Sequence, residues 1–112
     1  MTFFLILYLL VGLLFSGLAI PLILRRIKPN AWYGFRVEQT LHDPEVWYEA
    51  NAYAGKYMLG VGLVTSGVAI GLYLAPGLDE TVYLWVCTLT LLGGLGVSVT
   101  QSFRFLRRFT QK

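Results

Sequence analysis

The residues able to do chemistry are concentrated between Asn30 and Asn51. This stretch of 22 residues holds four of the six acids, the single histidine and two of the three tryptophans. His42 and Asp43 are adjacent, and adjacent side chains diverge on most backbones, so a catalytic dyad would need a further group from elsewhere. The chemistry that this stretch offers is therefore recognition rather than an obvious catalytic device, and we expect no catalytic residue, metal site or cofactor.

Two acids and one arginine in this stretch carry the clearest electrostatic hypotheses. Glu45 and Glu49 stand four residues apart on a predicted helix and could hold a cation or share a proton, although such a pair is more often a solvated acidic face. Arg36 could pair with either acid, or hold a lipid phosphate or a peptide carboxylate. We expect the ion pair within the chain. An interfacial enzyme that uses His42 and these acids near Arg36 is the least favoured alternative.

The elements that must position these residues are membrane-spanning helices. The chain is 56% hydrophobic, and the stretches 3–24, 57–75 and 81–103 contain no Asp, Glu, Lys, Arg or His. A bilayer core of about 30 Å needs about 20 apolar residues of helix, whose backbone groups are satisfied internally. The sequence predicts an all-α integral membrane protein with three transmembrane helices in a single domain, 1–112.

The basic residues predict the orientation of these helices. Five lie between the first and second stretches and four follow the third, while none precedes the first or lies between the second and third. The positive-inside rule then places the long loop and the C-terminus in the cytoplasm and the N-terminus outside, in a cell membrane protein. The net charge of +3 is explained by topology and by anionic lipid, on which we expect the tail 104–112 to lie, and nucleic-acid binding is not needed. A cleaved signal peptide is the weaker interpretation of the first stretch, because its basic residues follow the apolar run.

The second helix should extend beyond the bilayer or bend near Gly55. The segment 43–45 (Asp-Pro-Glu) is a strong helix start, with an N-cap, a proline in the first turn and an acid at the positive helix end. Nothing breaks the helix before Pro76, which gives about 32 residues and about 48 Å, roughly 18 Å more than the bilayer core. We expect 30–42 to be an ordered cytoplasmic loop, and Trp47 and Asn51 to share one face of the extension.

Small residues in the spans predict close helix packing. They are a Gly-x-x-x-Gly pair in the second span and a four-residue stripe in the third: Gly67, Gly71, Thr90, Gly94, Ser98 and Ser102. For the stripe in the third span we expect packing within the chain rather than a homo-oligomer seam. An oligomeric transporter or channel lined by hydroxyls such as Thr90, Ser98, Thr100 and Ser102 is the alternative, although spans without ionisable residues argue against an ion-coupled pump.

The central stretch also resembles the SdpI family of small bacterial multi-pass membrane proteins. The resemblance covers about 24 residues and is carried by Lys28-Pro29-Asn30, Tyr33-Gly34-Phe35-Arg36, Thr40-Leu41, Trp47 and Asn51. It departs from the family pattern at Val37, where a threonine is expected after the arginine. The best-known member confers immunity to a secreted peptide toxin and takes part in signalling by holding a transcriptional repressor at the membrane.

This resemblance implies a membrane-embedded interaction protein. Its motif core would be Asn30, Tyr33, Gly34, Arg36, Thr40, Trp47 and Asn51, acting as a docking surface or as a structural core at the cytoplasmic interface. The implied partners, besides the lipid bilayer, are a peptide toxin or a cytoplasmic regulatory protein, and a homo-oligomer is possible.

Overall fold

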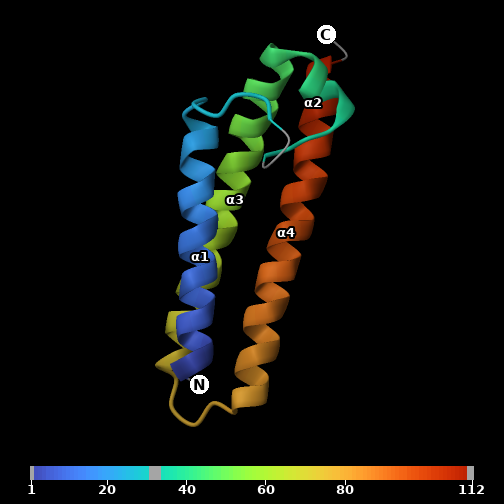
Figure 1. Cartoon of the computed structure of the whole chain (residues 1–112). Coiled ribbons are helices and arrows are strands. Elements are labelled where there is room, and N and C mark those ends of the chain that lie inside the picture. Colours follow the sequence, from blue (N-terminus) through green and yellow to red (C-terminus); the bar gives the residue numbers. More distant parts are fainter. Residues whose placement is uncertain (1, 31–33, 111–112) are drawn as a thin grey trace.

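The protein is a bundle of three long helices with a short helix over one end. The computed structural model describes residues 2–30 and 34–110, and within these ranges it contains no strand. The helices are α1 (Thr2–Ile23), α2 (Glu38–His42), α3 (Pro44–Tyr73) and α4 (Glu80–Thr110). The three long helices are apolar and long enough to cross a membrane, which confirms the predicted all-α membrane fold. α1 and α4 run in the same direction, with α3 antiparallel to both (Figure 1).

α3 is the central helix, because both α1 and α4 pack mainly against it. Its contact with α1 is made backbone to backbone at Gly12 and Gly62. A Cβ atom added to either glycine would lie 2.7 Å from the carbonyl oxygen of the other. The missing side chains are thus what permits this approach.

The Gly67–Gly71 pair is not part of that contact. A Cβ atom at either position would meet no described atom within 4 Å. In the described structure this narrow face of α3 is therefore open, and Gly62 is the α3 glycine that meets α1. The stripe on α4 does face α3, since a Cβ atom on Gly94 would lie 3.0 Å from a Val61 methyl carbon.

A tyrosine cluster joins the three helices at the end that carries the N-terminus. Tyr8, Ala69, Tyr83 and Cys87 are buried together. The Tyr8 hydroxyl lies 2.8 Å from the Thr88 hydroxyl, and Tyr83 donates to the carbonyl of Ala69 at 3.0 Å. These bonds join α4 to both α1 and α3 and supply partners for hydroxyls that would otherwise be costly in an apolar setting.

The start of α3 follows the predicted capping chemistry. The Asp43 carboxylate accepts the Glu45 N–H at 3.0 Å, and Pro44 occupies the first helical position. α3 has 30 residues, close to the 32 expected, so its first turns extend beyond an apolar span.

α4 is also longer than the sequence predicted, because it continues past Phe103 to Thr110. Leu106 is buried against Val46 and Ala50 of α3, and the Phe105 ring stacks on Tyr53 with centroids 4.2 Å apart. The tail up to Thr110 is thus helical and packs on α3 through Phe105 and Leu106, while its contact with lipid stays a prediction. The molecule is 53 Å long, well beyond a bilayer core of about 30 Å.

Candidate functional site

Residues 34–43, here called the cap, close the end of the bundle opposite the short turn between α3 and α4 (Figure 1). Asn51 of α3 attaches the cap to the bundle, and its side chain is only 1% exposed. Its Oδ1 accepts the Phe35 N–H at 2.5 Å, and its Nδ2 donates to the Trp47 carbonyl at 3.0 Å and lies 3.4 Å from the Phe35 carbonyl. One amide therefore serves both backbone groups of a cap residue.

Gly34 is required by this arrangement. Its φ of +116° lies in a region that side chains other than glycine rarely adopt. A Cβ atom there would lie 2.8 Å from Asn51 Oδ1 and 3.1 Å from the Trp47 ring. The glycine of the motif thus allows the cap backbone to lie directly on α3.

Thr40 orders the cap from within. It is fully buried, its hydroxyl accepts the Val37 N–H at 2.9 Å, and its oxygen lies 2.8 Å from the Phe35 carbonyl, to which it can donate. The N–H of Val37 is one of the groups that the start of a helix leaves without an intrahelical partner. Thr40 therefore supports α2, a helix of five residues inside what the sequence predicted as a loop.

Trp47 connects α3 to the segment that follows α1. The side chain is fully buried, and its Nε1 donates to the Ile27 carbonyl at 2.8 Å. Nearby, the Asn30 side chain donates to the Lys28 carbonyl at 2.7 Å, as expected for an asparagine in a turn. Tyr33 lies outside the described residues. Of the predicted motif core, Gly34, Thr40, Trp47 and Asn51 form one group around Phe35, in which the last three are buried.

Arg25 plays a part that the sequence analysis missed. Arg26 donates its N–H to the Pro21 carbonyl and Arg25 to the Leu22 carbonyl, which is the Schellman pattern of a helix end. Arg25 takes the left-handed position of this motif, with φ +58°, where glycine is usual. No local sequence signal marks an arginine for that conformation.

The side chain of Arg25 then forms a two-bond ion pair with Glu49, at 2.9 and 3.1 Å. Glu49 precedes the apolar part of α3, and the Arg25 guanidinium holds the pKa of this carboxyl below its usual 4.5, while Glu49 raises the pKa of Arg25. Glu49, one of the two acids considered as a partner of Arg36, thus pairs with Arg25. Glu45 donates its N–H to the carboxylate of Asp43, the N-cap of α3, and its side chain is exposed.

The outer face of the cap is chemically different from its buried side. We call its exposed residues before the α3 N-cap Asp43 the rim: Arg36, Glu38, Leu41 and His42. Leu41 is 45% exposed, which is high for a large apolar side chain outside the spans. Within the described residues no three His, Cys, Asp or Glu side chains come together as metal ligands would.

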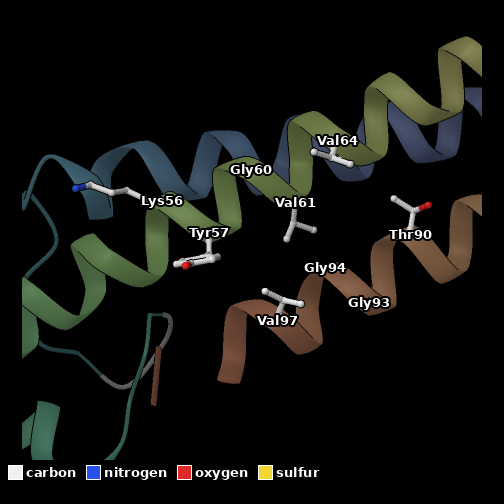
Figure 2. A pocket seen from close by; sticks show the side chains of 9 residues that line it. All are labelled: Lys56, Tyr57, Gly60, Val61, Val64, Thr90, Gly93, Gly94 and Val97. Carbon is white, nitrogen blue, oxygen red and sulfur yellow. The ribbon is translucent and has the colours of Figure 1, made fainter. Parts of the chain in front are cut away.

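Two of the hollows along the bundle are lined by residues of the predicted α4 stripe. One, of about 530 Å³, is a groove between α3 and α4 that Gly60, Val61, Thr90 and Gly94 help to line (Figure 2). The other, of about 350 Å³, lies beneath the cap and is lined in part by Ser98 and Ser102.

The hydroxyls proposed for a pore do not share one path in the described chain. Thr90 lines the groove, whereas Ser98 and Ser102 line the cavity beneath the cap. The Thr90 and Thr100 hydroxyls donate to carbonyls of their own helix, those of Val86 and Gly96, at 2.7 and 2.8 Å.

Comparison with known proteins identifies the family. No solved structure matches the chain significantly. The chain is 34% identical over 64 residues to a Bacillus subtilis (strain 168) protein named "Uncharacterized protein YfhL", a match that covers 53% of this chain and 58% of that protein. The sequence profile of the SdpI/YfhL protein family matches residues 26–100, which include the whole cap, α3 and most of α4. The chain therefore belongs to the SdpI/YfhL family, as the motif in its central stretch predicted.

Proposed function

We propose that this protein is a membrane-embedded interaction protein of the peptide-toxin immunity or signalling kind, with the rim of the cap as its docking surface. The observation that carries the proposal is the division of the motif into two parts. Gly34, Thr40, Trp47 and Asn51 are committed to holding the cap, and three of these side chains are at most 1% exposed. The rim, which these residues hold in place, is exposed and mixes both charges with an apolar side chain.

The charge distribution favours a cytoplasmic regulatory protein as the partner. The end of the bundle with the cap carries basic residues from three segments, for example Arg26, Arg36 and Arg104, whereas the short turn at the other end carries Asp79 and Glu80. By the positive-inside rule the cap would face the cytoplasm. A rigid surface there would be available to a soluble regulator, and the ordering cost of binding would be low because the cap is already fixed.

In-cell photo-crosslinking tests this proposal. A photoreactive residue at Leu41 should give an adduct with a distinct protein, identified by mass spectrometry, and Arg36→Ala should abolish it while the protein stays in the membrane. Arg26→Ala is the matched control, because it removes an exposed charge at the same end outside the rim. A photoreactive residue at Leu63, which is 60% exposed on the apolar part of α3, should label lipid only.

The outcomes separate docking from scaffolding. Adducts from Leu41 to lipid or to this chain alone would contradict the proposal. So would a protein adduct that survives Arg36→Ala, because the rim would then not be what the partner recognises.

A further inference from the structure

The cavity beneath the cap has the chemistry of a ligand site. It lies among α1, α3 and α4, and its volume of about 350 Å³ falls within the range of about 300–1,000 Å³ that small-molecule pockets occupy. Leu18, Met58, Leu95 and Val99 make its walls apolar. Because α1 and α4 each pack mainly on α3, the cavity lies where those two helices leave space beside each other.

One polar group in this cavity lacks a partner. Ser102 is 4% exposed, and its hydroxyl makes no hydrogen bond with any described residue. The neighbouring Thr100 shows the usual solution for a helical hydroxyl, a bond to the carbonyl four residues earlier. A buried hydroxyl without a partner is costly, so Ser102 points to an occupant that offers a hydrogen-bond acceptor.

Two aromatic rings line the cavity next to the cap, and each is followed in the sequence by an arginine. Phe35 of the cap and Phe103 of α4 line the cavity and pack edge to face, with centroids 5.0 Å apart. Their chain neighbours, Arg36 and Arg104, are exposed. An occupant whose tail fills the apolar cavity would therefore have its head beside two guanidinium-bearing residues, which suits a phosphate.

The depth of these groups matches that of a lipid. Ser102 lies at the end of the apolar stretch 81–103, where hydrocarbon gives way to the headgroup region. The ester carbonyls of a phospholipid lie at this boundary, between the acyl chains and the phosphate. From the bilayer core outward, a phospholipid presents an acyl chain, an ester carbonyl and a phosphate. The apolar cavity walls, the Ser102 hydroxyl and the two arginines would meet these groups in the same order.

We propose that this cavity binds one acyl chain of an anionic phospholipid, with the Ser102 hydroxyl donating to an ester carbonyl and the headgroup beside Arg36 and Arg104. This site shares Arg36 with the rim, but its test uses Ser98 and Ser102, which line the cavity and are not part of the rim. A bound lipid would also supply the packing that the cap lacks over the cavity, next to Gly34 and Asn51, which line it.

Native mass spectrometry of the full chain, with phosphatidylglycerol or phosphatidylcholine added to detergent, tests the site. One phosphatidylglycerol should stay bound at collision energies that remove phosphatidylcholine. Ser98→Leu, which places a larger side chain in the cavity, should abolish the retained adduct, whereas Thr90→Leu, on the groove instead, should leave it. Ser102→Ala should weaken binding about fivefold, as expected for one neutral hydrogen bond.

The thermal stability of Ser102→Ala shows whether weaker lipid binding in this variant results from misfolding. In lipid-depleted protein, Ser102→Ala should unfold at the same or higher temperature than the parent chain, because it removes an unpaired buried hydroxyl. No retained lipid, equal retention of both lipids, an unchanged adduct in Ser98→Leu, or a peptide in place of a lipid in the retained adduct would each overturn the proposal.

Discussion

Asn51 binds the backbone of Phe35 through both ends of its side-chain amide, accepting its N–H at 2.5 Å and approaching its carbonyl at 3.4 Å. An α-helix thereby presents to the cap the same donor and acceptor pair that a neighbouring strand would. Cap residues that lack regular backbone pairing are thus satisfied in a buried setting, where an unpaired backbone group is costly.

Replacing Asn51 with alanine should loosen the cap. We expect Asn51→Ala to lower the free energy of unfolding by about 1–3 kcal/mol, since the buried N–H of Phe35 would lose its partner. Denaturant titration in detergent gives the stability, and hydrogen exchange of residues 34–42 should rise. Thr100→Val, which removes an exposed hydroxyl on α4, should change neither quantity appreciably.

Trp47 should show two separable contributions. Trp47→Phe keeps most of the ring but leaves the Ile27 carbonyl without its donor, and we expect a loss of about 1–2 kcal/mol. Trp47→Ala adds a cavity and should cost about 3–5 kcal/mol. If Trp47→Phe and Trp47→Ala lost the same free energy of unfolding, the two contributions would not be separable, because the indole N–H would then account for the whole effect.

The glycines of α3 should respond differently to the same substitution. Gly62→Ala should separate α1 from α3 and cost about 1–3 kcal/mol, because the added methyl meets the Gly12 carbonyl at 2.7 Å. Gly67→Ala meets no described atom and should be neutral or stabilise the helix by up to about 1 kcal/mol. A loss at Gly67 that depends on protein concentration would instead indicate packing between copies.

The Arg25–Glu49 pair should make a modest, pH-dependent contribution. Because the pKa of Glu49 is lowered in the folded protein, the contribution is fully present above about 4.5 and is lost as the pH falls through the lower, folded value. Thermal unfolding of the parent chain and of Glu49→Gln should therefore converge in acid. The difference at neutral pH should be small, because both side chains are substantially exposed.

Two substitutions at Arg25 test its left-handed backbone conformation separately from the ion pair. Arg25→Gly and Arg25→Ala both remove the ion pair, but only glycine adopts a φ of +58° without strain. The glycine variant should therefore unfold at a higher temperature than the alanine variant. The reverse order would show that the Schellman end of α1 is not kept in the variants.

Much of the fold follows from sequence because its signals are strong and local. Uncharged stretches of about 20 residues fix the three long helices, and the Asp43–Pro44 start of α3 follows from capping chemistry. α2 could not be predicted, because five residues give no helical periodicity and its support comes from the Thr40 hydroxyl. The orientation in the membrane stays a prediction, made from the placement of the basic residues.

The candidate site was only partly accessible to the same reasoning. Helical spacing predicted that Trp47 and Asn51 share one face of α3, and both side chains are buried. Which glycine of α3 meets α1 depends on the rotation of the helix about its axis. Gly62 and Gly67 are five residues and about 140° apart on a helix, so a small-residue motif alone does not select the contacting face. The Arg25–Glu49 pair depends on a left-handed residue that no pattern marks.

The central position of α3 has a consequence for biogenesis. The hydrogen bonds of Asn51 with Phe35 and of Trp47 with Ile27 join residues within the first 73 of the chain. The α1–α3 hairpin can therefore enter the bilayer and close its cap while α4 is still being synthesised. α4 then docks on a surface that already exists, with Tyr83 and Leu106 as its anchors at the two ends.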